Sequence, residues 1–421
     1  MLTQAPKGTK DVLPGESVKW QYIEGIIRGI CARFGYGEIR TPVFEHTELF
    51  QRGVGGTTDI VQKEMYTFLD KGERSITLRP EGTAGVVRSF IENKLYADSQ
   101  PTKAYYLSAP IFRYERPQAG RLREHHQFGI EAFGAPGPSI DAEVISLALS
   151  VFKELKITGI ELNINSIGCK DCRPGYNEAL KGYLKQNESM LCGTCRERMQ
   201  TNPLRVLDCK EERCSDIVKN APVMLGCLCE DCETHFEGLK KRLATAGIEY
   251  SINPFIVRGL DYYTKTVFEI ISNDIGAKGT VCGGGRYDGL VEEIGGPPTP
   301  GIGFGMGIER LLLSIESAGV DMPRQRQCDV YVCSMGEEAA MKSFSIASEL
   351  RESGVKAECD HMGRSMKAQL KYANKIGAPW VIIIGEDEIN KGAAVVRDME
   401  NSKENSVPFK ELKSFIKAGL V

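Results

Sequence analysis

The sequence lacks long hydrophobic runs, and it lacks an excess of charge of either sign. Its 53 lysines and arginines are nearly balanced by 56 aspartates and glutamates, which leaves a net charge of -3. The longest purely apolar stretches, such as residues 381–384, are far too short to cross a bilayer, and the first residues lack the apolar region of a signal peptide. We therefore expect a cytoplasmic protein with no membrane span, and any contact with nucleic acid must come from local patches.

The sequence also lacks the two common glycine-rich nucleotide fingerprints. The stretch CGGGRYDGL at residues 282–290 contains glycines that allow a backbone to approach a ligand closely. It matches neither the Gly-x4-Gly-Lys phosphate loop nor the dinucleotide motif. If the protein binds ATP, another arrangement must hold the phosphates.

The length of 421 residues predicts two or three domains. The periodicity of apolar residues indicates amphipathic helices at 18–34 and 139–155. Between and after these helices it indicates strands at 38–45, 104–116, 127–134, 160–164, near 255 and at 266–271. Residues 76–83 read as a strand that runs into a helix start, and residues 301–313 read as a glycine-lined strand that enters a helix with Arg310 in its first turn. The strands at 104–116 and 127–134 should form an antiparallel hairpin around an arginine-rich loop.

A separate small domain is expected after residues 321–327, which read as a linker. Strands and helices alternate beyond it, which is typical of an α/β domain. The expected strands are 329–333, 355–359, 380–384 and 393–397, and the expected helices are 337–352, 364–376 and 408–418. The predicted fold class is therefore α/β, with an α+β first part built on an antiparallel sheet flanked by helices.

Cysteines are concentrated in one interval, because nine of the 14 lie between residues 169 and 232. Paired spacings favour metal over disulfides. The four pairs are Cys169 with Cys172, Cys192 with Cys195, Cys209 with Cys214, and Cys229 with Cys232. Two pairs fill one tetrahedral thiolate site, so the segment could hold up to two structural zinc ions, and Cys227 is left over. The alternative is a set of reduced cysteines without metal; a catalytic metal is disfavoured because an all-cysteine site is closed to substrate.

Arg258 stands in a stretch, RGLDYY, that gathers a cation, a carboxylate and two phenols beside an apolar run. At the end of a strand its guanidinium could reach a phosphate or a carboxylate of a ligand, whereas the alternative is a structural ion pair with Asp261. Arg113 and Arg310 supply two more cations without a Walker lysine. Together the three arginines suit a triphosphate bound on an open antiparallel sheet.

Two acidic residues and one amide extend this set. The carboxylates of Glu81 and Glu131 and the amide of Gln127 could bind an ammonium group and a second protonated nitrogen. A substrate that carries both an amine and a carboxylate suits this set of carboxylates and arginines, because each buried charge needs a partner.

These stretches together resemble the histidyl-tRNA synthetases, which are class II aminoacyl-tRNA synthetases. Residues 8–11 resemble the N-terminal segment of the family, and 39–50 with Pro42 resemble motif 1, the dimer interface. Residues 112–131 resemble motif 2 and 303–310 resemble motif 3. The stretches RGLDYY and GGRYD resemble the histidine-specific signatures, so the resemblance points to one amino acid.

The resemblance implies a homodimer that activates L-histidine with ATP and Mg²⁺ and transfers it to the 3′ end of tRNA(His). It implies a catalytic domain at 1–165 and 246–322, a mainly helical Cys-rich insertion at 166–245, and an anticodon-binding domain at 328–421. The catalytic groups would be Arg113, Arg258 and Arg310. The histidine-binding residues would be Glu81, Thr83, Gln127, Glu131, Arg258, Tyr262 and Tyr263.

On the ATP side, the resemblance implies binding by Arg113, Glu115, Arg121, His125 and Arg310. His125 stands where the family commonly has a phenylalanine that stacks on adenine, and we expect the stacking to survive with some sensitivity to pH. Gln118 and Arg123 would meet the acceptor end of the tRNA.

The alternative function is that of a catalytically inactive relative, the regulatory subunit of ATP phosphoribosyltransferase. Such relatives usually lack the C-terminal domain and lose arginines of motif 2 or motif 3. This chain keeps Arg113, Arg258 and Arg310 as well as residues 328–421, which disfavours the alternative.

Overall fold

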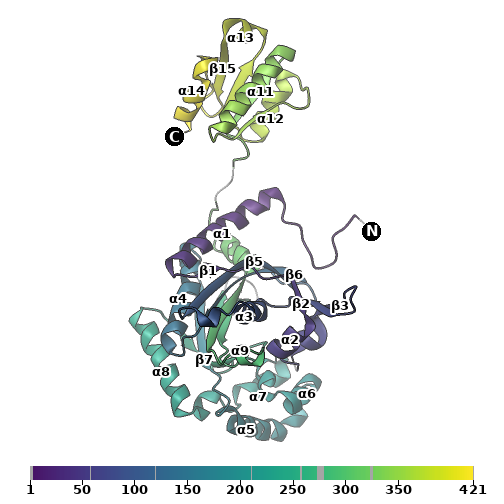
Figure 1. Cartoon of the computed structure of the whole chain (residues 1–421), viewed down its shortest axis with the longest axis vertical. Helices are drawn as coiled ribbons and strands as arrows, with labels where there is room; N and C mark the ends of the chain where they lie inside the picture. Colours follow the sequence, from purple (N-terminus) through teal and green to yellow (C-terminus); the bar gives the residue numbers. More distant parts are fainter. Residues whose placement is uncertain are drawn as a thin grey trace. The chain divides into compact units, whose positions relative to one another are not determined.

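The computed structural model describes residues 3–56, 58–118, 120–209, 211–256, 258–272, 279–322 and 326–420. The chain divides into two compact units, residues 1–322 and 323–421 (Figure 1). The predicted linker at 321–327 spans this division, and its residues 323–325 lie outside the described part of the chain. No helix among the described residues combines the length and the apolar character that a membrane span requires.

The first unit is built on an eight-stranded sheet with the order β1-β5-β6-β11-β10-β9-β7-β8. Neighbouring strands are antiparallel from β5 to β7, and the parallel pairs β1/β5 and β7/β8 lie at the two edges. The strands are β1 (Gly37–Glu38), β5 (Thr102–Phe112), β6 (Glu124–Phe133), β7 (Ile160–Ser166), β8 (Ser251–Ile252), β9 (Thr264–Ser272), β10 (Gly279–Arg286) and β11 (Gly301–Gly307). The predicted hairpin is confirmed as β5 and β6.

The two faces of this sheet have different partners. The helices α1 (Pro14–Arg33), α4 (Pro138–Glu154), α8 (Glu230–Thr245) and α10 (Ile308–Ser317) share one apolar core with the strands. On β6, Phe128 and Ile130 point into that core, whereas Gln127 and Glu131 alternate with them and face the other side. The helices α3 (Thr83–Glu92) and α9 (Leu290–Glu293) pack on this second side.

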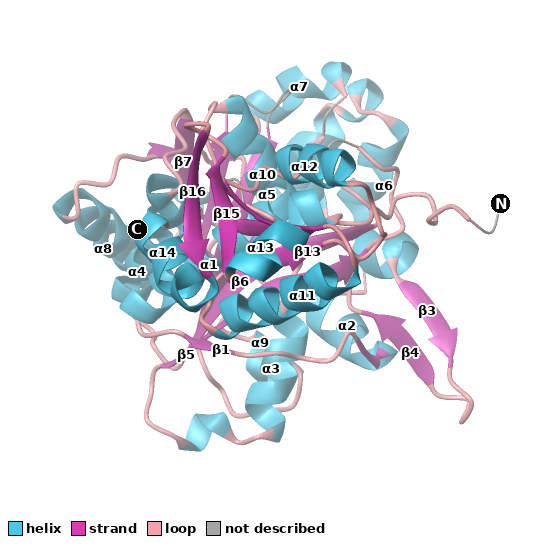
Figure 2. Cartoon of the chain, turned by 90° about the horizontal axis from the view of Figure 1, so that it is seen from above, coloured by secondary structure: helices cyan, strands magenta, loops and turns pink. Residues whose placement is uncertain are grey.

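A small three-stranded sheet lies beside the large one, with the order β2-β4-β3. It contains β2 (Phe44–His46), β3 (Tyr66–Leu69) and β4 (Ser75–Leu78), and α2 (Thr47–Val54), the π-helix η1 (Ile60–Glu64) and the short η2 (Leu95–Ala97) complete this region. Figure 2 shows β3 and β4 at the periphery of the first unit.

Three strand predictions need correction. The strand predicted at 38–45 is two short strands in different sheets, because Pro42 between them has no N–H to donate. The strand predicted at 104–116 ends at Phe112; the N–H of Glu115 bonds back to the carbonyl of Arg113, so these two side chains do not share a strand face. The strand expected near Phe255 is the pair at Ser251–Ile252, and Phe255 lies in a turn; Val257 falls outside the described residues.

The cysteine-bearing insertion is mainly helical, as predicted. Its elements are α5 (Arg173–Gln186), η3 (Glu188–Met190), α6 (Gly193–Thr201), η4 (Pro203–Asp208), α7 (Glu212–Lys219) and η5 (Met224–Cys227), followed by α8. Figure 1 shows α5, α6 and α7 gathered at one end of the first unit. Phe236, Leu239 and Leu243 of α8 pack into the core of the large sheet, so this last helix ties the insertion to the rest of the unit.

The second unit carries a five-stranded sheet with the order β13-β12-β14-β15-β16. Its strands are β12 (Val330–Ser334), β13 (Ala357–Cys359), β14 (Trp380–Ile384), β15 (Ala393–Asp398) and β16 (Lys403–Pro408), and its helices are α11 (Glu337–Glu352), α12 (Met366–Lys375), α13 (Glu386–Lys391), η6 (Phe409–Glu411) and α14 (Leu412–Gly419). The α/β prediction is confirmed. The sequence analysis missed α13, which is very short, and β16, which has one buried residue and no apolar alternation.

Candidate active site

A buried carboxyl group, that of Glu131, lies on the second face of the large sheet. The hydroxyl of Thr83 donates to its Oε1 at 2.7 Å, and the hydroxyl of Tyr287 donates to its Oε2. Burial raises the pKa of Glu131 to about 8, although both hydrogen bonds act in the opposite direction. The group therefore exchanges its proton close to neutral pH.

A second carboxyl group, that of Glu81, lies close enough to Glu131 to raise its pKa further. Glu81 lies two residues before the start of α3, and its two oxygens accept the N–H groups of Thr83 at 2.7 Å and Ala84 at 2.8 Å. These bonds satisfy two free donors of the helix start. Burial raises the pKa of Glu81, and the backbone bonds oppose that shift.

Glycines of β10 and β11 form the floor beneath these side chains. A Cβ atom on Gly303 would lie 2.0 Å from Oε2 of Glu131, and one on Gly305 would lie 2.1 Å from Nε2 of Gln127. A Cβ atom on Gly283 would lie 2.2 Å from Nη2 of Arg258. In this structure the glycines therefore let side chains of the site itself, those of Glu131, Gln127 and Arg258, lie directly against the sheet.

Tyrosines lie around these carboxyl groups. The rings of Tyr262 and Tyr263 have centroids 4.7 Å apart, and those of Tyr262 and Tyr287 are 5.7 Å apart. The hydroxyl of Tyr106 donates to Oε1 of Gln127 at 3.3 Å. No role was predicted for Tyr106 or Tyr287, although Tyr287 stands in the GGRYD stretch, where a phenol at the end of a glycine-rich strand was the available signal.

Arg258 pairs with a carboxylate that the sequence analysis did not single out. Its guanidinium contacts Oε1 of Glu269 on β9 and lies 5.8 Å from the centroid of the Tyr263 ring. Burial by itself would lower the pKa of Arg258. The negative charge of Glu269 acts in the opposite direction, and the pKa of Arg258 is raised. The predicted alternative, a structural pair of Arg258 with Asp261, is wrong, because the described ion pairs join Asp261 to Arg205 instead.

The other two arginines of the predicted site each donate to a backbone carbonyl. Nε of Arg113 donates to the carbonyl of Pro80 at 2.8 Å, just before Glu81. Arg310, in the first turn of α10, donates to the carbonyl of Thr280. Burial lowers the pKa of Arg310, the charge of Arg121 lowers it further and that of Glu115 opposes this, so these three side chains are within electrostatic reach of one another.

In the loop between β5 and β6, some residues of the predicted site are exposed and others contact the rest of the protein. The backbones of Gln118 and Arg121 exchange hydrogen bonds at 2.8 and 3.0 Å, and both side chains are exposed. Arg123 is turned toward the protein: its guanidinium lies 4.0 Å from the centroid of the Tyr114 ring, and its Nε donates to the carbonyl of Glu115 at 3.2 Å. Gly8 of the N-terminal segment packs against it.

The two neighbouring histidines have different surroundings. Burial, and after it the charge of Arg113, lowers the pKa of His125 to about 4, so its ring is neutral near pH 7. His126 is held by Glu309, whose carboxylate accepts the His126 backbone N–H at 2.9 Å and lies 2.9 Å from Nδ1 of its ring. A flat neutral ring at His125 keeps the shape that stacking on a base requires.

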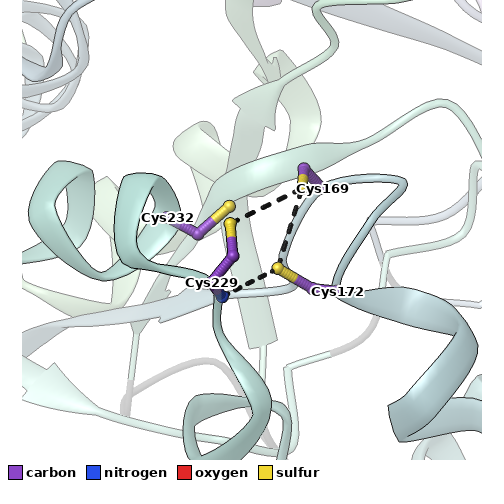
Figure 3. A group of neighbouring side chains, drawn as sticks. All are labelled: Cys169, Cys172, Cys229 and Cys232. Carbon is purple, nitrogen blue, oxygen red and sulfur yellow. Dashed lines mark hydrogen bonds between the residues drawn. The ribbon is translucent and has the colours of Figure 1, made fainter.

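Eight of the cysteines form two groups of four. Cys169 and Cys172 join Cys229 and Cys232 (Figure 3), and Cys192 and Cys195 join Cys209 and Cys214. All sulfurs of a group lie within 4.8 Å of one another, with Cys169 and Cys172 at 3.6 Å and Cys192 and Cys209 at 3.8 Å. Four thiolates at zinc bonding distance on tetrahedral corners are about 3.8 Å apart. The donor set and its spacing therefore fit zinc.

Comparison with known proteins identifies the family. The family model described as histidyl-tRNA synthetase matches residues 8–171 and 219–311, and the anticodon binding domain model matches 329–419. Residues 172–218, which include the second group of four cysteines, lie between the two matched parts.

Relatives of nearly the same length support the match. The histidine–tRNA ligase of Acetivibrio thermocellus is 59% identical over 99% of this chain and 100% of the relative. That of Caldanaerobacter subterraneus subsp. tengcongensis is 57% identical, with the same coverage.

Among solved structures, apo histidyl-tRNA synthetase of S. aureus is 39% identical, with a TM-score of 0.84 over 98% of this chain and 99% of that one. A Bacillus halodurans structure named as an ATP phosphoribosyltransferase regulatory subunit/histidyl-tRNA synthetase is 21% identical, with a TM-score of 0.63 over 91% of this chain and 99% of that one, and shares the fold. From these matches, the chain belongs to the histidyl-tRNA synthetase family and is a class II aminoacyl-tRNA ligase of the histidine–tRNA ligase type.

Proposed function

We propose that the residues gathered on the second face of the large sheet activate L-histidine with ATP and pass it to tRNA(His). The main support is the buried Glu131, which lies close to Glu81, accepts hydrogen bonds from Thr83 and Tyr287, and shares its face of the sheet with Gln127. This set of side chains offers an acceptor for a ring N–H and further acceptors for an ammonium group.

Histidine recognition rests on the polar groups of this pocket. Glu131 and Tyr262 bind the imidazole nitrogens, while Glu81, Thr83 and Gln127 hold the α-ammonium, with Tyr263 beside them. A buried carboxyl group that is left unpaired by an apolar amino acid penalises the wrong substrate strongly, which supports selection by hydrogen bonding. The pKa of Glu131 near 8 means that imidazole binding and ionisation of this carboxyl group are coupled.

In the activation step, a carboxylate oxygen of histidine attacks the α-phosphorus of ATP. The bond from that phosphorus to the bridging oxygen breaks, pyrophosphate leaves, and histidyl-adenylate remains. Arg258 and Arg113 flank the α-phosphate, Arg310 and Arg121 bind the outer phosphates, and Glu115 with His125 binds adenine. Fixed cations aimed at developing charge are the main source of acceleration in such chemistry; Mg²⁺ bound to ATP supplies further charge neutralisation.

In the transfer step, a hydroxyl group of the terminal ribose of tRNA attacks the carbonyl carbon, and AMP leaves. Gln118 is exposed on the loop and is the candidate for a base contact. Arg123, whose guanidinium packs on the ring of Tyr114, contacts the acceptor end of the tRNA. The second unit, which matches the anticodon binding domain model, binds the anticodon. The place of the reaction is the cytoplasm, where tRNA is charged.

Structural zinc in the insertion is supported by the two groups of four cysteines. The segment between them consists of short helices, and metal would hold such a segment together where apolar burial is limited. Protein purified without chelator should contain about two zinc ions per chain by elemental analysis, and changing Cys169 and Cys172 to serine should remove one of them. Less than one zinc per chain would contradict the assignment.

Assembly as a homodimer is supported by the apolar surface of the small sheet. Phe44 on β2, two residues after Pro42 in the motif 1 stretch, is 55% exposed, and Phe68 and Leu69 on β3 are 49% and 67% exposed. Exposed apolar side chains on one small sheet are typical of an interaction surface.

Pyrophosphate exchange that depends on histidine tests the activation step directly. The purified protein should exchange labelled pyrophosphate into ATP with histidine and not with the other amino acids. Without exchange, the proposal of an active ligase would be wrong, and the regulatory function of the inactive relatives would replace it.

A further inference from the structure

The segment from Gly193 to Asp208 connects the second cysteine group to the loop that carries Arg258 and Tyr262. It consists of α6 and η4. Cys192 and Cys195 stand at its start, and Cys209 and Cys214 follow its end, so the four sulfurs hold both ends. We call it the bridging segment.

Two side chains of the bridging segment contact the loop. Nη2 of Arg205 donates to the carbonyl of Gly259 at 2.6 Å. Nδ2 of Asn202 donates to Oδ1 of Asp261 at 3.1 Å, and Nη2 of Arg205 lies 3.9 Å from the same oxygen. The loop is thus held at the residues directly after Arg258 and directly before Tyr262.

Further contacts hold the bridging segment in this position. Nη1 of Arg198 donates to the carbonyl of Arg205 at 3.4 Å, and its Nη2 donates to Oδ2 of Asp59 at 3.0 Å. The side chain of Arg205 is only 15% exposed. It lines a cleft of about 270 Å³ between the insertion and the loop, together with Asn202, Arg258 and Tyr263.

The loop needs such support because residues 258–263 form no helix or strand. On one side Asp261 packs against the backbone of Gly55, whose Cβ position would lie 2.7 Å from Oδ2 of Asp261. On the other side the contacts come from the bridging segment. A loop of this kind holds its side chains in a reactive geometry only when its neighbours fix the backbone.

We propose that Asn202 and Arg205 are positioning residues for histidine activation, and that metal bound by Cys192, Cys195, Cys209 and Cys214 keeps them on the loop. This inference rests on the proposed roles of Arg258 and Tyr262. The insertion then holds the loop in place through these two residues, and bound metal keeps the insertion in the arrangement that allows these contacts. Neither residue touches the substrate.

The test compares Arg205→Ala and Asn202→Ala with Arg196→Ala as a matched control. Arg196 lies in the same bridging segment, on α6, but donates to the carbonyl groups of Glu188 and Ser189 inside the insertion. Arg205→Ala should lower kcat/KM for histidine in pyrophosphate exchange by roughly tenfold or more, the scale of one lost buried hydrogen bond. KM for histidine should rise and zinc content should stay that of the wild type.

Arg205→Lys provides a rescue, because a lysine can still donate to the carbonyl of Gly259, and it should recover part of the lost kcat/KM. Wild-type kinetics in Arg205→Ala, or an equal loss in Arg196→Ala, would overturn the inference. Absence of exchange in the wild-type protein would overturn the proposed function instead, so the two failures are distinct.

The metal step is tested by Cys209→Ser alone and combined with Arg205→Ala. If the metal acts through the bridging segment, the single variant should reproduce the loss of kcat/KM, and the double variant should lose little more. Independent, additive losses would contradict the coupling. Should Cys209→Ser fail to fold, wild-type protein stripped of zinc takes its place in the same comparison.

Discussion

Glu131 shows how one buried residue can control both binding and stability. It has no exposed surface, and its pKa is raised to about 8 from 4.5. A group whose pKa is higher in the folded protein contributes stability in full below its unfolded pKa. That contribution is lost as the pH rises through the folded value.

We therefore expect the unliganded protein to lose stability between about pH 5 and pH 8, and Glu131→Gln to remove part of that loss. The difference should be on the order of a few kcal/mol, since a neutral amide imitates the protonated carboxyl group. Thermal unfolding of both proteins across this pH range measures it. The exposed Glu249→Gln is the control, and parallel curves for the wild type and Glu131→Gln would show that the carboxyl group does not titrate there.

For Arg258 we predict how its substitution changes the two steps of histidine binding and adenylate formation. Arg258→Ala should slow adenylate formation by about 100-fold or more and weaken histidine binding much less, because the guanidinium acts on charge that develops at the phosphate. Rapid-quench kinetics and equilibrium binding separate the two effects.

Removal of Arg258 also takes from Glu269 the cation with which it pairs among the described residues, so the double variant Arg258→Ala with Glu269→Gln serves as the control for folding. An equal loss of binding and of adenylate formation would contradict the assigned role.

At the scale of elements, the glycine-rich strands β10 and β11 shape the pocket. A Cβ atom on Gly303 or Gly284 would meet backbone carbonyls, whereas the three nearest atoms to a Cβ on Gly305 all belong to the side chain of Gln127. The strand around Gly305 can therefore accept a methyl group if Gln127 moves.

Gly305→Ala should accordingly raise KM for histidine by roughly tenfold while the fold is kept, because the amide loses its place beneath the ammonium site. Gly289→Ala is the control, since its nearest contact would be Glu293 at 3.9 Å. Steady-state pyrophosphate exchange measures KM for histidine, and thermal unfolding checks that the fold is kept. An unchanged KM would contradict the proposed role of Gln127 in binding the ammonium group.

At the scale of the whole molecule, the two compact units should separate by function. A chain ending at Met322 should keep histidine-dependent exchange, because each unit has its own core. Its rate of tRNA charging at limiting tRNA should fall at least about tenfold, since the contact with the anticodon is lost. Normal charging by the truncated chain would contradict an anticodon role for the second unit.

Dimer formation belongs to the same scale. Light scattering should give about twice the mass of the chain, and Phe44→Asp combined with Leu69→Asp should shift it toward the monomer, because charge on the exposed small sheet disfavours its burial. Met341→Asp, on an exposed position of α11, is the control. A monomer mass at every concentration of the wild-type protein would exclude the dimer.

Local patterns in the sequence were sufficient for much of this molecule. Apolar periodicity predicted α1, α4, the β5/β6 hairpin, β11 leading into α10, and most of the second unit, because each pattern repeats within one element. Cysteine spacing predicted that the cysteines group in pairs, and the motif stretches indicated the family; the roles of Glu81, Glu131, Arg258 and Arg310 stay predictions. All of this depends on neighbours in the chain.

Only the tertiary structure decided which distant groups meet. Cys169 and Cys172 join Cys229 and Cys232 across the whole insertion, Arg258 takes Glu269 rather than the nearby Asp261, and Tyr287 reaches Glu131. β16 exists because β15 supplies its hydrogen bonds, although most of its own residues are polar. Such contacts depend on how several elements pack at once, and packing of remote side chains leaves no periodic trace in the sequence.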